Sequence, residues 1–181
     1  IRDGFSRVMK GDLDALEPMD IADVSRLHFR GGSVLGTSRA NPTKNPEDLQ
    51  RVVDTLKAKG IDKLITIGGD DTSFSAVNVQ QTAGGSIRVA HVPKTIDNDL
   101  DLPPEICTFG YQTARHHGVE IIQSLMTDAR TTGRWYIAIA MGRSAGHLAL
   151  GIGKAAGATL TLIPEEFDQR PFRLQQLVDT I

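Results

Sequence analysis

Two aspartates lie two residues apart in Thr95-Ile96-Asp97-Asn98-Asp99, directly after a predicted strand and the lysine Lys94. In extended backbone, residues two apart point the same way, so we expect the carboxylates of Asp97 and Asp99 to face one cleft. One carboxylate would accept a hydroxyl proton while the other binds a metal ion or orients the first. Lys94 would stabilise the oxygens of a phosphoryl group in transfer. The structural alternative is a surface turn, which Asn and Asp favour.

A second acidic turn, Gly68-Gly69-Asp70-Asp71-Thr72, follows the run LITI and opens a predicted helix. Its glycines permit close backbone approach to an anion, and the helix N-terminus adds donors and a favourable dipole. Two carboxylates would repel a bound phosphate unless a divalent metal ion lay between them and the phosphate. Mg²⁺ characteristically joins carboxylates to phosphate oxygens in this way. The alternative is helix capping by Asp71 or Thr72, and this turn alone does not decide between the two.

Arginines are placed to bind anions near the same edge of the predicted sheet. Met141-Gly142-Arg143 follows the apolar run WYIAIA, where Arg143 is suited to grip a phosphate or carboxylate with two N–H groups. Arg39 and Arg134 add two further cations. For each arginine singly, an ordinary surface ion pair is the simpler interpretation. Together with acids suited to metal binding, they are the residue types that recur in the active sites of phosphoryl-transfer enzymes.

Three other patterns do not lead to a site. Residues 142–146 (GRSAG) match the nucleophile elbow of serine hydrolases, but only His147 follows Ser144, and it lies next door. Residues 151–156 (GIGKAA) match a dinucleotide-binding turn, but they lie inside a predicted helix and before a strand. The five histidines show no metal-ligand spacing.

The elements that must position these turns alternate between helical and strand periodicity. Helices are predicted over 47–59, 72–82, 111–126, 144–156 and 171–181, strands over 62–67, 86–92, 134–140 and 159–163, and a loop over 93–107. This alternation predicts an α/β fold with an open, mainly parallel, doubly wound sheet. Ligands bind such sheets beyond the carboxyl ends of the strands, where all three turns fall.

Length and composition narrow the class of protein. The chain has 181 residues and a net charge of −2, which suits one ordinary folded domain and disfavours a polybasic nucleic-acid surface. Cys107 is the single cysteine, so an intrachain disulfide and a multi-cysteine zinc site are excluded, and a reducing cytoplasm is favoured. No apolar run approaches the ~20 residues of a membrane span.

Taken together and in this order, the turns resemble those of the phosphofructokinase family. The resemblance covers nearly the whole chain, and the order and spacing of its motifs are far more specific than any single motif. The motifs are Asp3-Gly4-Phe5, residues 31–39 (GGSVLGTSR), 68–72 and 93–99, Thr108-Phe109-Gly110-Tyr111, residues 141–143 and Pro164-Glu165. The fold that this resemblance implies is a phosphofructokinase-like, Rossmann-like lobe of a longer two-lobed enzyme.

The resemblance implies a sugar-phosphate site around residues 95–99. Asp97 would be the base that deprotonates the 1-hydroxyl of fructose 6-phosphate, and Arg39 would stabilise the moving phosphoryl group. Arg134 would reach the sugar phosphate of a neighbouring subunit, which implies a homo-oligomer with shared active sites. The other residues of the substrate site would be Thr95, Ile96, Asp99, Met141, Gly142 and Arg143.

The resemblance also implies a donor site around residues 68–72. Asp70 would hold Mg²⁺, and the phosphate donor would be bound by Gly68, Gly69, Asp71 and Thr72. ATP-using members carry glycine where this chain has Asp71 and Lys94, and both substitutions resemble the pyrophosphate-dependent branch. The Asp71 carboxylate would repel the α-phosphate of ATP, and Lys94 would supply charge to a pyrophosphate that has no nucleoside to anchor it. Both therefore count among the catalytic residues.

The predicted function is Mg²⁺-dependent transfer of a phosphoryl group from pyrophosphate to fructose 6-phosphate, a reversible step of glycolysis. The first alternative is an ATP-dependent 6-phosphofructokinase. A kinase of the NAD-kinase or lipid-kinase type would leave residues 95–99 and 141–143 without a role. A regulatory subunit with a decayed site is disfavoured by the intact acids and Arg143.

The family's first glycine-rich strand is missing before Ile1, and its second lobe is missing after Ile181. We therefore expect residues 1–181 to form one phosphofructokinase-like domain truncated at both ends. The expected partners are fructose 6-phosphate and pyrophosphate, without nucleic acid or membrane, in the cytoplasm.

Overall fold

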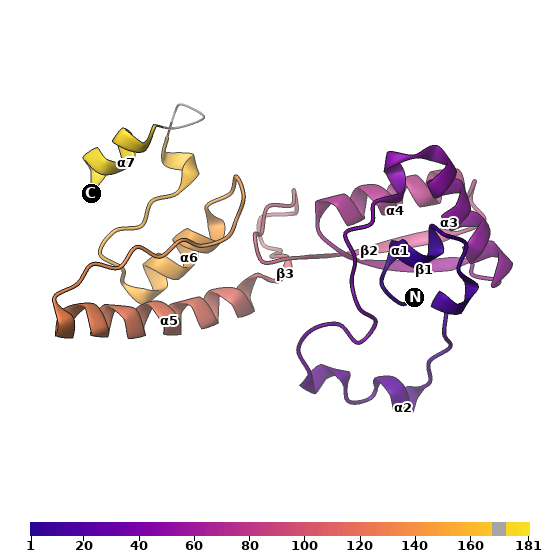
Figure 1. Cartoon of the computed structure of the whole chain (residues 1–181), viewed down its shortest axis with the longest axis horizontal. Helices are drawn as coiled ribbons and strands as arrows, with labels where there is room; N and C mark the ends of the chain where they lie inside the picture. The colour runs from indigo at the N-terminus through magenta and orange to yellow at the C-terminus, as the bar shows by residue number, and fades with distance from the viewer. Residues whose placement is uncertain (168–172) are drawn as a thin grey trace. The chain divides into compact units, whose positions relative to one another are not determined.

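The structure is a computed structural model that describes residues 1–167 and 173–181. Its elements are shown along the chain in Figure 1. The chain divides into two compact units, Ile1–Val92 and Pro93–Ile181, and each has its own packing. Strand β2 (Arg88–Thr95) carries the chain from the first unit into the second.

The first unit packs two helices against strands. Its elements are α1 (Phe5–Val8), η1 (Leu13–Ala15), α2 (Ile21–Val24), η2 (Leu27–Phe29), η3 (Pro42–Lys44), α3 (Pro46–Ala58), β1 (Lys63–Gly68), α4 (Asp70–Thr82) and the first part of β2. The predicted helices over 47–59 and 72–82 are confirmed by α3 and α4, and the predicted strand over 62–67 by β1. Helix α3 begins where the periodicity places it, because Asn45 caps the amide of Glu47 and Pro46 occupies the first turn.

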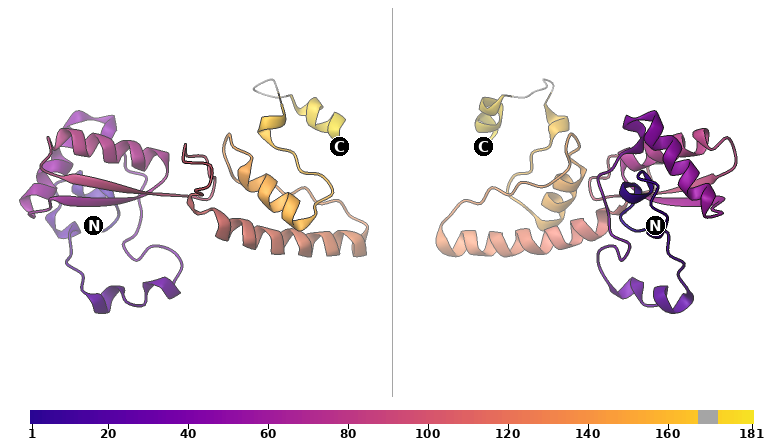
Figure 2. Two further views of the ribbon diagram at one scale, coloured as in Figure 1. Left: turned by 180° about the vertical axis from the view of Figure 1, so that it is seen from behind. Right: turned by 45° about the vertical axis from the view of Figure 1, so that its right-hand side comes forward.

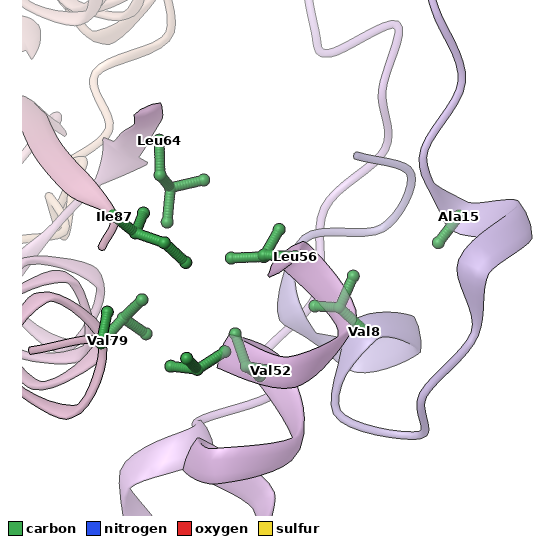
Figure 3. Close-up of a cluster of buried hydrophobic side chains, with 9 residues drawn as sticks. Val8, Ala15, Val52, Leu56, Leu64, Val79 and Ile87 are labelled. Atoms are coloured by element: carbon green, nitrogen blue, oxygen red, sulfur yellow. The ribbon is translucent and has the colours of Figure 1, made fainter. Parts of the chain in front are cut away.

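The core of the first unit is apolar and fully enclosed. Figure 3 shows Val52 and Leu56 of α3 between Val8 on one side and Val79 and Ile87 on the other. Burying a side chain such as Leu or Ile contributes roughly 1.5–3 kcal/mol, so this cluster holds α3 and α4 against the strands. Alternate residues of β1 are buried, and Leu64 is the one that belongs to this core.

The strands are hydrogen-bonded in the order β1-β2-β3, with β3 at Phe109–Gly110. β2 and β3 are parallel, with Lys94 opposite Phe109 and Thr95 opposite Gly110. Strand β2 corresponds to the strand predicted over 86–92, but it ends at Thr95. The predicted end of the strand and the predicted start of the loop at residue 93 are therefore wrong by three residues. Pro93 does not close the strand, because the pairing with β3 continues the ladder beyond it.

The second unit is built on a pair of helices. After β3 come α5 (Tyr111–Thr132), α6 (His147–Ala156), η4 (Pro164–Glu166) and α7 (Leu174–Thr180). Helices α5 and α6 lie side by side in all views of Figures 1 and 2. Glycines permit this close approach, since a Cβ at Gly118 would lie 2.4 Å from the side chain of Ile152. The predicted helix over 111–126 is confirmed and extends to Thr132, where Gly133 ends it in a left-handed conformation.

Two predicted strands, over 134–140 and 159–163, are wrong: the structure forms neither helix nor strand there. Both segments are apolar enough for a buried strand, yet a strand also needs a pairing partner, and neither segment pairs with another strand among the residues described. The side chains of Trp135 and Ile139 are 83% and 93% exposed. Periodicity alone does not reveal whether an apolar run will find a pairing partner.

The two C-terminal helices begin later than predicted. Helix α6 begins at His147 rather than residue 144, because a tight turn over 142–145 precedes it, closed by the Ala145 amide donating to the Gly142 carbonyl (2.8 Å). The predicted last helix over 171–181 is α7 from Leu174, and residues 171–172 lie outside those described. In the described ranges, no helix has both the length and the apolar character needed to cross a membrane.

Candidate active site

The residues 95–99 form a tight turn at the end of β2, hereafter the acidic turn. The Asp97 amide donates to Thr95 Oγ1 (3.1 Å), and Asn98 adopts a left-handed conformation (φ 54°). Asn tolerates this conformation better than most residues, because its short polar side chain bonds to nearby backbone. The carboxylates of Asp97 and Asp99, on either side of Asn98, contact a single cation.

That cation is Arg143. Its Nε lies 3.6 Å from Asp97 Oδ2, and its Nη2 donates to Asp99 Oδ2 (2.5 Å). Both carboxylates thus contact one arginine, but through a left-handed step at Asn98 rather than the extended backbone that the sequence predicted. The predicted roles of the three residues stay predictions. The Arg143 side chain as a whole is 61% exposed.

The turn that carries Arg143 has a strained backbone conformation. Arg143 has φ 52° and Gly142 has φ 152°, and both values are unfavourable for ordinary residues. A Cβ at Gly142 would lie 2.2 Å from the Ala145 carbonyl oxygen. Only glycine fits there, so the predicted Met141-Gly142-Arg143 motif has a physical reason for its central residue.

Each aspartate keeps one oxygen without a protein partner. Asp97 is only 9% exposed, and the Oδ1 atoms of Asp97 and Asp99 are buried without a hydrogen-bond partner. An unpaired buried carboxylate oxygen is costly, so such an atom is suited to accept a bond from a ligand hydroxyl or a cation. This arrangement can both abstract a proton and bind a charged group.

Residues 68–72 belong to the first unit and join β1 to α4. A Cβ at Gly68 would lie 2.3 Å from Thr72 Oγ1, which explains the glycine. Gly69 is the N-cap residue of α4, and no side chain caps the helix there. Asp70 and Asp71 lie in the first turn of α4, and their side chains are exposed. The helix-capping alternative for Asp71 and Thr72 is wrong, because Gly69 takes that position. The predicted strand–turn–helix context of this motif is confirmed.

The remaining predicted residues are placed as follows. Lys94 is exposed on β2, and Ile96 lies in the acidic turn, half-buried. Arg39 is exposed in an irregular segment of the first unit, and Arg134 is exposed directly after α5. Met141 is 70% exposed at the start of the Gly142 turn. These positions leave their predicted roles as predictions.

Thr108 bonds to two residues of the acidic turn, Thr95 and Asn98, and the sequence motifs predicted no role for Thr108 or Asn98. The Thr108 amide donates to Asn98 Oδ1 (2.9 Å), and its hydroxyl donates to the Thr95 carbonyl (2.7 Å). The signal available in the sequence was an Asn between two aspartates, a residue that favours left-handed turns. Thr108 begins one of the motifs of the family resemblance, residues 108–111, but that motif gave it no role at this turn.

The donor chemistry of these residues fits a hard divalent cation. Mg²⁺ takes oxygen ligands, and in phosphoryl-transfer sites it uses one or two carboxylates together with substrate phosphates. Asp70 and Asp71 present exposed carboxylates at a helix N-terminus, and Asp97 and Asp99 keep unpaired oxygens. No cluster of three acidic, histidine or cysteine side chains is formed by the residues described, so a metal at either pair would complete its shell with phosphate and water.

The comparisons with known proteins agree with the motifs. The sequence pattern of the phosphofructokinase family matches residues 1–181. The chain belongs to this family. It is 56% identical over 169 residues to a protein of Thermotoga maritima named pyrophosphate–fructose 6-phosphate 1-phosphotransferase, covering 93% of this chain and 40% of that protein. An ATP-dependent 6-phosphofructokinase of Mycobacterium tuberculosis is 40% identical over 152 residues, covering 84% and 42% of the two chains.

Solved structures carry the same fold. The chain matches the crystal structure of a Pichia pastoris phosphofructokinase in the T-state with a TM-score of 0.82 and 24% identity, over 99% of this chain and 18% of that one. The predicted α/β, phosphofructokinase-like fold is therefore confirmed. The chain spans about two fifths of the length of the curated relatives quoted above.

Proposed function

We propose that the protein containing this chain transfers a phosphoryl group from pyrophosphate to the 1-hydroxyl of fructose 6-phosphate, giving fructose 1,6-bisphosphate and phosphate. The observation that carries the proposal is the pair of mostly buried carboxylates, Asp97 and Asp99, bridged by Arg143. A general base beside a cation is what attack by a sugar hydroxyl on a phosphoryl group requires. The pyrophosphate-dependent relative is the more similar of the two relatives quoted, which supports this donor over ATP.

In this reaction the 1-oxygen of the sugar forms a bond to the terminal phosphorus of pyrophosphate. The bond between that phosphorus and the bridging oxygen breaks, and phosphate leaves with the electron pair. The hydroxyl proton passes to Asp97, whose unpaired Oδ1 is the acceptor that the geometry offers. Asp99 holds Arg143 beside the base, and Thr95 holds the Asp97 amide.

Arg143 has a second task in this proposal. Its side chain is 61% exposed while it contacts both aspartates, so a ligand in solution can approach it. A planar guanidinium binds phosphate through paired N–H groups. Arg143, with Met141 and Gly142, would bind the sugar phosphate and place the 1-hydroxyl near Asp97.

The donor side of the proposal rests on the Gly68–Thr72 turn, Lys94 and Arg39. Gly68, Gly69 and Thr72 would hold pyrophosphate at the N-terminus of α4, where backbone amides favour anions. Mg²⁺, when bound, neutralises phosphate charge, and Asp70 would hold it. Lys94 and Arg39 would stabilise the phosphoryl group in transfer, and Asp71 would exclude ATP by charge repulsion.

We further propose that this chain is part of a longer two-lobed enzyme that acts in glycolysis in the cytoplasm. In this proposal the enzyme is a homo-oligomer in which Arg134 reaches the sugar phosphate of a neighbouring subunit. The share of the relatives' length that the chain spans supports the larger enzyme. The family resemblance supports shared sites.

A coupled assay of the full-length protein with each donor tests the proposed function. Formation of fructose 1,6-bisphosphate is followed with pyrophosphate or with ATP, both with Mg²⁺ and after its removal by a chelator. We expect Mg²⁺-dependent turnover with pyrophosphate and almost none with ATP. A preference for ATP would replace the donor assignment by the ATP-dependent alternative, and turnover with neither donor would overturn the proposed activity.

A further inference from the structure

The acidic turn is held by hydrogen bonds from a residue outside it. Thr108 lies just before β3 and is 2% exposed, so its polar groups are shielded from water. Its amide donates to Asn98 Oδ1 (2.9 Å) and its hydroxyl donates to the Thr95 carbonyl (2.7 Å). One buried residue thus bonds to the turn both before and after Asp97.

The hydroxyl has two acceptors within reach but only one proton. Asn98 Oδ1 lies 3.3 Å from Thr108 Oγ1, while the Thr95 carbonyl lies at 2.7 Å. The shorter contact takes the proton, and the amide of Thr108 satisfies Asn98. The two bonds are therefore not interchangeable, and loss of the hydroxyl leaves the Thr95 carbonyl without this partner.

Asn98 is the residue whose conformation needs this support. Its φ of 54° is costly for most residues, and it persists where surrounding bonds over-determine it. Asp97 and Asp99 flank Asn98, so the left-handed step is what sets the direction of both carboxylates. Arg143 contacts the side-chain carboxylates, whereas Thr108 bonds to the Thr95 carbonyl and the Asn98 side chain.

From this we infer that Asn98 and Thr108 act as a positioning clamp that fixes the Asp97 carboxylate for catalysis. The clamp touches neither substrate nor the reacting atoms; it acts through the acidic turn. This inference rests on the proposed function for its effect on turnover. Its effect on the turn itself does not depend on the reaction.

Thr108→Val tests the hydroxyl, because valine keeps the branched shape and the amide bond while removing the bond to Thr95. A displacement of about 1 Å in a catalytic group can cost on the order of 10²-fold in rate. We expect kcat to fall by about tenfold to 10²-fold, with the KM for fructose 6-phosphate changed by less than about threefold. Thr108→Ser keeps the hydroxyl and should restore kcat to within about threefold.

Thr55→Val is the matched control. Thr55 is also a buried threonine, in α3, whose hydroxyl donates to the carbonyl of Arg51 (2.7 Å) and reaches that of Val8 (3.2 Å). It has no part in the proposed site. Loss of its hydroxyl should lower the thermal unfolding temperature and leave kcat unchanged.

Hydrogen exchange of the full-length protein supplies a readout that does not need turnover. Amides of residues 95–99 should exchange about tenfold faster or more in Thr108→Val, and at an unchanged rate in Thr55→Val. Asn98→Gly, which keeps the left-handed conformation but removes the acceptor, should also speed exchange in this segment. Unchanged exchange in both clamp variants would overturn the inference whether or not the enzyme turns over.

Measurements of kcat distinguish a failure of the clamp from a failure of the proposed function. If the unmutated protein turns over and Thr108→Val retains its kcat as Thr55→Val does, the clamp has no catalytic role and the inference fails while the proposed function stands. If the unmutated protein shows no turnover but exchange responds as expected, the clamp stands as a property of the turn and the proposed function fails.

Discussion

At the scale of single residues, Asp97 is the centre of the candidate site. Its side chain is mostly buried, one oxygen faces Arg143 at 3.6 Å, and the other has no protein partner. Asp97→Asn keeps the shape and removes the ability to accept a proton. We expect kcat to fall by about 10²–10⁴-fold with little change in the KM for fructose 6-phosphate, measured by steady-state kinetics. A kcat within a few-fold of the unmutated enzyme would show that Asp97 is not the base.

The choice of donor is also a matter of single residues. In the proposed function, Asp71 repels the α-phosphate of ATP, and unfavourable like-charge contacts cost several kcal/mol. Asp71→Gly should therefore give measurable turnover with ATP. Lys94→Gly should lower kcat with pyrophosphate by roughly 10²-fold or more, because charge stabilisation of the transition state is lost.

Kinetics of both single variants and the double variant, with each donor, provide the measurement. The effect of Lys94 is expected mainly with pyrophosphate and that of Asp71 mainly with ATP. If both variants changed turnover equally with pyrophosphate and with ATP, the substitutions would disturb the site in general rather than alter the selection of the donor.

At the scale of elements, the pairing of β1 with β2 contains a titratable group. A hydrogen bond joins Thr66 Oγ1 and His91 Nδ1 (2.9 Å). Burial lowers the pKa of His91, although a backbone hydrogen bond with Gly68 opposes this shift. The folded state therefore binds the His91 proton less readily than the unfolded chain, whose histidine keeps a pKa of about 6.5.

The stability contributed by neutral His91 is present above that pKa and is lost as the pH falls below it. We expect the midpoint of urea unfolding to decrease between pH 7 and pH 5, and His91→Gln to reduce this dependence. His116→Gln is the control, because His116 lies on α5 with an exposed side chain. The same pH slope in the unmutated protein and His91→Gln would contradict the assignment.

At the scale of the whole molecule, the proposal of shared sites concerns Arg134. This residue follows α5 and is exposed, so it is available to a neighbouring subunit. If Arg134 serves the neighbour's site, a mixture of Arg134→Ala and Asp97→Asn enzymes should regenerate some sites without either defect. Activity recovered on mixing, relative to each variant alone, is the measurement.

Subunit exchange must be verified independently, for example by mass spectrometry of mixed oligomers carrying two tags. Mixed oligomers without recovered activity would leave Arg134 as an ordinary surface cation. The same mixing of Asp97→Asn with unmutated enzyme gives the activity expected without complementation.

The sequence by itself determined the local elements of the first unit and the family. Helices α3 and α4 and strand β1 follow from apolar spacing, capping residues and glycines, all of which act within a few residues of each other. The order and spacing of the turns predict the phosphofructokinase family, and the family match over residues 1–181 confirms it. Asp97, Asp99 and Arg143 were also found in this way, from their place after apolar runs.

Only the tertiary structure decided which distant groups meet. The approach of Arg143 to Asp99, 44 residues away, and to Asp97 depends on how the chain returns after α5, which no local pattern encodes. The end of β2 was set by its pairing with β3, and the apolar run over 134–140 formed no strand because strand formation needs a partner. The buried bonds of Thr108 to the acidic turn likewise arise from β3 returning beside β2, since hydrogen bonds between remote segments exist only once packing has brought them together.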